Sequence, residues 1–263
     1  MARRSRLDAE LVRRGLARSR EQAVELVHAG LVRVSGSTAT KPATAVEPGT
    51  PVVVERPDDD PAYASRGGHK LAGALDALPG VAVPGRRALD AGASTGGFTD
   101  VLLRRGAREV VAVDVGYGQL AWSLRTDPRV RTYDRTNVRD LTPETIGGPV
   151  DLTVADLSFI PLTLALPALA ACTAGDGDLL PMVKPQFEVG RERVGAGGVV
   201  RDPDLRAQAV RTVADAAYRL GLGTVGVVRS PLPGPAGNVE LFLWLRRAAP
   251  PVDPAAIDEA VRT

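Results

Sequence analysis

RALDAGASTGGFTDVLL, residues 87–103, is the stretch that decides the fold. Its first part is typical of a short strand, and its last part is typical of a helix. Between them lies a turn with three glycines, Gly92, Gly96 and Gly97, which allow the backbone to bend sharply and to lie close to a ligand. A strand, a glycine turn and a helix in this order indicate the ligand-binding edge of an α/β sheet.

Segments typical of strands and segments typical of helices alternate from this stretch to residue 245. Strands are predicted at residues 87–92, 109–115, 130–134, 151–158, 177–184, 224–230 and 238–245, and helices at residues 97–106, 118–125, 162–173 and 203–220. This pattern predicts an α/β fold with a doubly wound, mostly parallel sheet and helices on both faces. A short link rich in proline and glycine joins the last two strands, which allows one of them to run antiparallel.

The first 58 residues form a separate predicted domain. Apolar residues recur at helical spacing in two short stretches that end at Gly15 and Gly30, and residues 31–34 and 51–55 are typical of strands. Residues 1–33 carry eight arginines against four acids, a local balance of +4, whereas the whole chain has a net charge of +2. Such clustering at one end suggests contact with a polyanion.

The composition favours a soluble protein of the cytoplasm. Cys172 is the single cysteine, which excludes an intramolecular disulfide. The N-terminus is charged and lacks the apolar stretch of a secretory signal. The charge-free residues 157–175 approach the ~20 residues that span a bilayer, but they contain two prolines and lie between predicted strands. We therefore interpret them as a buried crossover helix.

Two acids frame a ligand site at the glycine turn. The turn departs from the dinucleotide fingerprint G-x-G-x-x-G, because Ser94 stands at the second glycine position. Asp90, at the end of the first strand, would repel a pyrophosphate but suits a ligand with an ammonium group. Asp114 ends the second strand and is positioned to accept hydrogen bonds from a ribose diol. Together these features predict S-adenosylmethionine rather than NAD as the cofactor.

Lysine is rare in this chain, since 30 of its 33 basic residues are arginine and the lysines are Lys41, Lys70 and Lys184. A lysine can lose its charge near neutral pH when it is desolvated, whereas a guanidinium group stays protonated. Two ammonium groups that face each other would further disfavour each other's charge. Lys184, at the end of an apolar strand, and Lys70 are therefore candidates for sites where a removable proton is needed.

Two acids complete a candidate catalytic set with these lysines. Asp156 and Lys184 follow apolar strands, so both fall at the edge of the sheet where ligands bind. Glu240 begins the last predicted strand and reaches the same edge if that strand is antiparallel. Taken singly, each also has an explanation without catalysis: Lys70 as a loop cation, Asp156 as a helix cap, Glu240 as an edge charge, and Lys184 as a lysine retained by chance. Only their combination points to catalysis.

Several motifs resemble known families. RLD at 6–8, GLARSR at 15–20 and GLVRVSG at 30–36 resemble an S4 RNA-binding domain. DAGASTGGFTDVLL resembles the cofactor loop of the FtsJ-related methyltransferases. The order lysine, aspartate, lysine, glutamate resembles the tetrad of ribose 2′-O-methyltransferases. Over nearly its whole length the chain is similar to the TlyA-type, haemolysin-A-like rRNA methyltransferases.

This resemblance implies a Rossmann-like class I methyltransferase, with a seven-stranded, mostly parallel sheet, preceded by a small α+β S4 domain. The implied activity is 2′-O-methylation of cytidine in ribosomal RNA, and the arginine-rich start resembles the form that modifies both 16S and 23S rRNA. In the implied tetrad Lys184 is the base, Lys70 is its cationic partner or stabilises the oxyanion, and Asp156 and Glu240 orient them. The division of work between the two lysines stays open.

The expected site residues fall into two further groups. The expected cofactor-binding residues are Asp90, Gly92, Ser94, Thr95, Gly96, Gly97, Asp114 and Asn137, the last of which the resemblance places near the adenine. The expected RNA-binding residues are Arg4, Arg6, Arg18, Arg20, Lys41 and Arg66. The expected domains are an S4 domain at 1–58, a linker at 59–66, a methyltransferase domain at 67–248 and a C-terminal tail at 249–263.

We expect a cytoplasmic monomer that acts on ribosomal RNA or ribosomal subunits, without a metal and without a membrane. Three alternatives are weaker. A non-catalytic RNA-binding or ribosome-assembly protein would not need an intact tetrad and glycine turn. A membrane-lytic haemolysin would need a membrane span or a basic amphipathic helix. A dehydrogenase would need the dinucleotide fingerprint.

Overall fold

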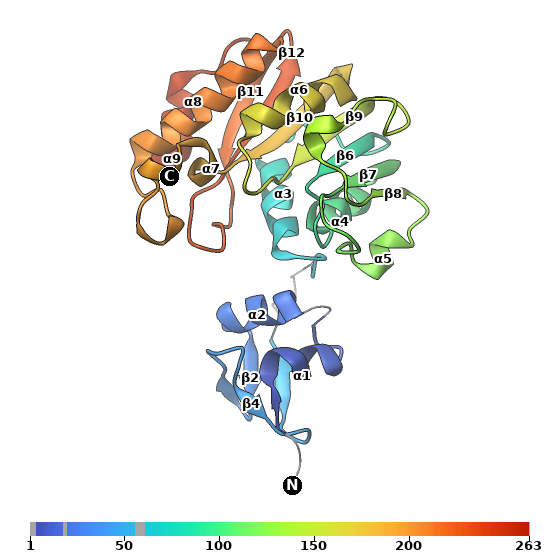
Figure 1. Cartoon of the computed structure of the whole chain (residues 1–263), viewed down its shortest axis with the longest axis vertical. Coiled ribbons are helices and arrows are strands. Elements are labelled where there is room, and N and C mark those ends of the chain that lie inside the picture. The colour runs from blue at the N-terminus through green and yellow to red at the C-terminus, as the bar shows by residue number, and fades with distance from the viewer. Residues whose placement is uncertain (1–3, 18–19, 56–60, 263) are drawn as a thin grey trace. The chain divides into compact units, whose positions relative to one another are not determined.

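The computed structural model describes residues 4–17, 20–55 and 61–262. The chain divides into two compact units, Met1–Ala62 and Tyr63–Thr263 (Figure 1). Each unit encloses its own hydrophobic core, as expected of parts that fold around separate sets of apolar residues.

The first unit consists of two helices packed on short strands. Its elements are β1 (Ser5–Arg6), α1 (Leu7–Arg13), α2 (Arg20–His28), β2 (Val32–Val34), β3 (Ser37–Thr38), β4 (Ala45–Val46) and β5 (Val52–Val54). β2 lies between β3 and β5 in an antiparallel sheet, and β1 pairs with β4. The two helices and the β2–β5 pairing agree with the sequence. The other strands have two residues each and are too short to show a periodicity.

The second unit is built on a seven-stranded sheet with the order β11-β12-β10-β9-β6-β7-β8. The strands are β6 (Arg87–Ala91), β7 (Glu109–Val113), β8 (Val130–Tyr133), β9 (Val150–Ala155), β10 (Thr173–Val183), β11 (Leu222–Arg229) and β12 (Leu241–Arg247). β12 pairs antiparallel with both neighbours, and the other pairs are parallel. The predicted mostly parallel sheet with an antiparallel strand near its end is therefore confirmed.

Helices cover both faces of this sheet. They are α3 (Arg66–Ala77), α4 (Gly97–Arg104), α5 (Trp122–Arg125), α6 (Leu162–Cys172), α7 (Pro185–Glu188), α8 (Pro203–Arg219) and α9 (Pro254–Arg262), with 3₁₀ turns η1 (Val138–Asp140), η2 (Arg191–Arg193) and η3 (Ala196–Gly198). Side chains of β7 alternate between the faces, since Val110 belongs to the core cluster that contains residues of α3 and α4, whereas Val111 belongs to the cluster that contains residues of α6, α8 and α9. The doubly wound arrangement follows from this alternation.

The structure differs from the sequence-based expectation at several elements. α3 occupies residues that were expected to be linker and loop, and Ala64, before it, is buried with its N–H donating to Asp100. The expected C-terminal tail contains α9, which buries Ile257 fully and packs on α8 and β11. This segment belongs to the domain because its apolar face completes the core. β10 begins at Thr173, earlier than predicted, and α5 is restricted to Trp122–Arg125.

Candidate active site

Asp90 lies in β6, two residues before the glycine turn, and is fully buried. Its Oδ2 accepts a 2.6 Å hydrogen bond from Thr99 Oγ1 on α4, whereas its Oδ1 is buried with no hydrogen-bond partner among the described residues. Burial raises the pKa of the Asp90 carboxyl to about 7, against the opposing effect of the Thr99 hydrogen bond. A buried acceptor left open in this way fits a ligand that brings its own donor, such as an ammonium group.

Asp114 follows β7 and ties the glycine turn to the next loop. Its Oδ2 accepts from the Ser94 N–H at 2.8 Å, and its Oδ1 accepts from the Gly116 N–H at 2.7 Å. Because each carboxylate oxygen has a second lone pair, Asp114 can still accept hydrogen bonds from a ligand. Asp90 in β6 and Asp114 directly after β7 therefore lie on either side of the glycine turn.

The glycine turn is confined by its neighbours. Gly92 has a φ of +88°, and a Cβ at this position would lie 2.5 Å from the backbone oxygen of Asp156. Gly96 has a φ of +97°, so both positions require a conformation that L side chains rarely adopt. Gly97 lies against Ser65 and Gly68 at the start of α3. The turn is thus packed between the residue after β9 and the beginning of α3.

Two other expected cofactor residues have defined local contacts. The carbonyl oxygen of Thr95 accepts from the Ala121 N–H at 3.2 Å, which fixes the turn to the segment before α5. The Asn137 side chain accepts from the Arg139 N–H at 3.1 Å and caps η1. These contacts place both residues on loops next to strands β6 and β8, and their ligand contacts stay a prediction.

The four candidate catalytic residues form two ion pairs. Lys70 Nζ on α3 lies 2.5 Å from Glu240 Oε2, and both side chains are buried. Lys184 Nζ lies 2.5 Å from Asp156 Oδ1 and donates to Ser158 Oγ at 2.9 Å. The Asp156 side chain is 23% exposed, whereas that of Glu240 is 1% exposed. The Asp156–Lys184 pair is therefore the one that a substrate can reach more easily.

Strand register brings the two pairs together. Val183 pairs with Leu241, so the next residues along these antiparallel strands, Lys184 and Glu240, are cross-strand neighbours. The Asp156 N–H donates to the carbonyl oxygen of Ala91 at 3.0 Å, directly before Gly92. All four side chains thus gather where β9 and β10 end and β12 begins, beside the glycine turn. This is the edge at which doubly wound sheets bind ligands.

The four residues that the sequence pattern singled out lie at this edge of the sheet, but their ion-pair partners were not predicted, and their catalytic roles stay a prediction. Each ammonium group contacts a carboxylate, because the β10–β12 register and α3 bring an acid to each lysine. That the two ammonium groups face each other stays a prediction. Ser158 was missed as a partner of Lys184. Its residue type and its place at the end of a predicted strand gave no signal of that contact.

Several solvent-exposed arginines of the first unit form ion pairs with buried acids. Arg6 and Arg20 both pair with Asp8, and their side chains are about half exposed whereas Asp8 is buried. The Arg6 guanidinium is the main cause that lowers the pKa of the Asp8 carboxyl to about 2. Arg4 pairs with Glu47 and is well exposed, as is Lys41. Arg18 lies outside the described residues, and Arg66 begins α3 in the second unit.

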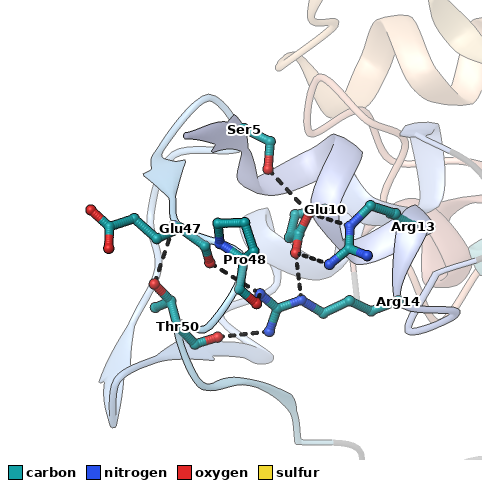
Figure 2. Close-up of polar contacts among 7 residues, drawn as sticks. All are labelled: Ser5, Glu10, Arg13, Arg14, Glu47, Pro48 and Thr50. Carbon is teal, nitrogen blue, oxygen red and sulfur yellow. Dashed lines mark hydrogen bonds and ion pairs between the residues drawn. The ribbon is translucent and has the colours of Figure 1, made fainter. Parts of the chain in front are cut away.

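A second buried acid of this unit holds two arginines with different roles. Glu10 accepts from Arg13, Arg14 and Ser5, as Figure 2 shows. The Arg14 guanidinium also donates to the carbonyl oxygens of Glu47, Pro48 and Thr50, so it joins α1 to the loop before β5. The Arg13 side chain is 62% exposed. Arg14 is therefore a structural residue, whereas Arg13 adds a solvent-facing cation that the sequence pattern did not single out.

Two features are absent from the described part of the chain. None of its helices combines the length and the apolar character that crossing a bilayer requires. Within the same residues, no group of three or more histidine, cysteine, aspartate or glutamate side chains is arranged to hold a metal ion.

Comparison with known families identifies both units. The model of the FtsJ-like methyltransferases matches residues 63–247, which include the glycine turn and both ion pairs. The chain belongs to the FtsJ-like methyltransferases. Its FtsJ-like unit is preceded by a match to the S4 domain at residues 5–52, in agreement with the α+β unit described above.

Three relatives place this FtsJ-like chain more closely. TlyA of Mycobacterium tuberculosis, a 16S/23S rRNA (cytidine-2′-O)-methyltransferase, is 66% identical over 246 residues, which cover 94% of this chain and 91% of the relative. Hemolysin A of Brachyspira hyodysenteriae is 35% identical, covering 89% and 97% of the two chains. A solved structure from Streptococcus thermophilus, described as a candidate hemolysin, has 39% identity and a TM-score of 0.79, covering 100% of this chain and 96% of that one.

Proposed function

We propose that the protein transfers a methyl group from S-adenosylmethionine to the ribose 2′-hydroxyl of cytidine in ribosomal RNA, in both 16S and 23S rRNA. The observation that carries this proposal is the convergence of two lysine–carboxylate pairs beside the glycine turn, at one edge of the sheet. The high identity to a 16S/23S rRNA (cytidine-2′-O)-methyltransferase supports the choice of substrate.

S-Adenosylmethionine, when bound, supplies an electrophilic methyl group on a sulfonium centre. Asp90, with its open buried oxygen, would accept from the ammonium group, and Asp114 would accept from the ribose diol. The backbone of Gly92, Gly96 and Gly97 would lie against the cofactor, with Ser94 and Thr95 between them. We place Asn137, on the loop after β8, next to the adenine.

The raised pKa of the Asp90 carboxyl predicts a pH dependence of cofactor binding. Its carboxyl is neutral below a pKa of about 7 and ionised above it, and only the ionised form attracts an ammonium group. The affinity for S-adenosylmethionine should therefore rise as pH increases through about 7, and Asp90→Asn should remove this rise. Titration calorimetry near pH 6 and pH 8 measures the effect, with the exposed Asp76→Asn as control. Equal pH dependence in wild type and Asp90→Asn would contradict the assignment.

Lys184 is proposed as the base. A ribose hydroxyl is a poor nucleophile, and its proton must leave as its oxygen attacks the methyl carbon. A neutral Lys184 amine would accept that proton at Nζ. The resulting ammonium group would then have the partners seen in the structure, with Asp156 Oδ1 at 2.5 Å and Ser158 Oγ at 2.9 Å. Asp156 thus orients Lys184 and stabilises its protonated form.

Lys70 and Glu240 form the more buried pair. We propose that Glu240 fixes the Lys70 ammonium on α3, and that Lys70 supplies a stationary positive charge next to the reacting hydroxyl oxygen. A preorganised charge in a site of low water content stabilises developing negative charge more strongly than a solvated one does. The two lysines then have separate roles, one in proton transfer and one in electrostatic stabilisation. No metal is needed for either role.

The S4 unit is proposed to bind ribosomal RNA through phosphate contacts of Arg4, Arg6, Arg18, Arg20 and Lys41, with Arg66 adding a contact from the second unit. Arg6→Ala and Arg20→Ala should each weaken binding to ribosomal subunits and reduce the slope of log affinity against log salt by about one. Arg211→Ala, which removes an exposed and acid-paired arginine on α8, is the control and should change neither. Unchanged salt slopes in both S4 variants would place the RNA contacts elsewhere.

The deciding experiment is transfer of tritiated methyl from S-adenosylmethionine to purified 30S and 50S subunits, followed by nuclease mapping of the labelled nucleotide. We expect label on the 2′-oxygen of a cytidine in each subunit, transferred by a monomeric protein of the cytoplasm. Absence of label in both subunits would refute the proposed function. Label in one subunit, or at another nucleotide, would correct the substrate but leave the reaction intact.

A further inference from the structure

Two loops at the catalytic edge are joined by more than the Asp156–Lys184 ion pair. The aspartate loop, residues 156–161, runs from the end of β9 to the start of α6. The lysine turn, residues 184–188, runs from the end of β10 through α7. Lys184 contacts Asp156 and Ser158, and the rings of Phe159 and Phe187 lie 5.4 Å apart between their centroids.

Glu188 makes a third connection, at the far end of both segments. Its Oε1 accepts a 2.8 Å hydrogen bond from the N–H of Leu162, the first residue of α6. That N–H is one of the donors that an α-helix leaves unpaired at its start. The residue at the cap position is Pro161, whose side chain has no acceptor. A carboxylate from another segment of the chain therefore caps α6.

This cap fixes the aspartate loop at its second end. At its first end, the Asp156 N–H donates to Ala91 O, beside the glycine turn. At its second end, the hydrogen bond to Glu188 attaches Leu162 to the lysine turn. The loop between these points carries both partners of Lys184. Without the second attachment, the ion pair, the Lys184–Ser158 hydrogen bond, the ring contact and the burial of Leu157 would still hold the loop, but its junction with α6 would lose its hydrogen bond to the lysine turn.

We propose that Glu188 is a positioning residue that holds the aspartate loop, and with it Asp156 and Ser158, in place against Lys184. The proposal rests on the proposed function only for its effect on rate, because the geometry that it describes can be measured without a substrate. Glu188 touches neither Asp90 nor Asp114 among the contacts described, so its loss should affect the reaction rate more than cofactor binding.

Glu188→Ala and Glu188→Gln separate this role from a general structural one. The glutamine keeps an acceptor for the Leu162 N–H, and the alanine removes it. Displacement of reacting groups by about 1 Å can cost about 100-fold in rate, so we expect Glu188→Ala to lower the single-turnover rate about 10- to 100-fold. The affinity for S-adenosylmethionine should stay within about twofold, and Glu188→Gln should recover most of the rate. Glu192→Ala, at a well-exposed glutamate of η2, is the matched control.

A substrate-free measurement keeps the test independent of the methyl-transfer assay. The chain has three lysines, so labelling by an amine-reactive reagent can be followed at each by mass spectrometry. We expect Glu188→Ala to increase the labelling rate of Lys184 several-fold relative to Lys41 in the same sample, and Glu188→Gln and Glu192→Ala to leave it unchanged. If Lys184 labelling in Glu188→Ala equals that of wild type, or if the glutamine and alanine variants behave alike, the proposal is wrong. Because labelling needs no ribosomal RNA, a failure here is distinct from a failure of the proposed methyl transfer, which only the assay with ribosomal subunits would reveal.

Discussion

Replacing Lys184 with alanine is expected to slow methyl transfer by about 10²- to 10⁴-fold, the usual contribution of a positioned proton acceptor. The variant lacks the amine that receives the hydroxyl proton, whereas Asp90, Asp114 and the glycine turn stay intact. The affinity for S-adenosylmethionine should therefore be nearly unchanged. Single-turnover transfer to ribosomal subunits measures the rate, and titration calorimetry measures the affinity.

Lys184→Arg tests the same role more strictly. Arginine keeps the positive charge and can pair with Asp156, but a guanidinium group cannot become neutral near physiological pH. If Lys184 is the base, the arginine variant should be nearly as slow as the alanine variant. Arg211→Ala, at an exposed arginine of α8, should keep the wild-type rate of chemistry. A wild-type rate in Lys184→Arg would show that a fixed charge is sufficient, and the base would have to be sought elsewhere.

The second large effect is expected on stability. Lys70→Ala leaves the carboxylate of Glu240, which is 1% exposed, without its cation. Removing one member of a buried ion pair costs about 3–5 kcal/mol, which corresponds to a decrease in melting temperature of about 6–20 °C for a unit of this size. Urea denaturation and calorimetry of the full chain would measure this loss.

The double variant Lys70→Met/Glu240→Gln separates folding from catalysis. It replaces both charges, so it should regain most of the lost stability, because no buried charge stays unpaired. The rate of methyl transfer should stay low, because the fixed cation is absent. If the double variant recovers the rate together with the stability, Lys70 and Glu240 serve the fold alone. If Lys70→Ala is as stable as wild type, the pair is not desolvated in the folded protein.

Most of the second unit could be predicted because its strands are short apolar runs separated by helical periodicity. The turn at residues 92–97 was recognisable because its glycines meet a physical need, and two of them have positive φ angles. The short link before β12 indicated that one of the last two strands could run antiparallel, and the structure shows that it is β12. In these places the local sequence preference and the three-dimensional fold favour the same backbone conformation.

α3 could not be predicted because its glycines lower the intrinsic preference for a helix by about 1 kcal/mol each. The structure explains them by packing rather than by a turn. A Cβ on Gly68 would lie 2.6 Å from Cγ of the Tyr63 ring, and one on Gly73 would lie 2.6 Å from Cγ of Pro231. Pro231 is far from Gly73 in the chain, and Tyr63 meets Gly68 only because of how the segment before α3 folds, so a helical pattern in the sequence reveals neither contact. The sequence pattern therefore favours a loop at Lys70, where the structure has a helix.

The partners of the two candidate catalytic lysines could not be predicted from the sequence either. Which acid meets which lysine depends on the β10–β12 register and on the position of α3, and both are set by contacts between residues far apart in the chain. Ser158 and Glu188 acquire their contacts in the same way. A pattern of residue types can indicate that such groups meet at a sheet edge, but not how they pair.

The reversed direction of β12 has a consequence for how this enzyme tolerates length changes. Because Glu240 precedes the strand, shifting β12 by one residue against β10 would put Val239 or Leu241 opposite Lys184 and would turn the buried side chains of the strand to the other face. A single insertion between Asn238 and Leu241 would shift this alignment. The hydrogen-bond ladder between β10 and β12 thus fixes the position of Glu240 relative to Lys184, so the spacing along this strand shapes the candidate site as much as side-chain identity does.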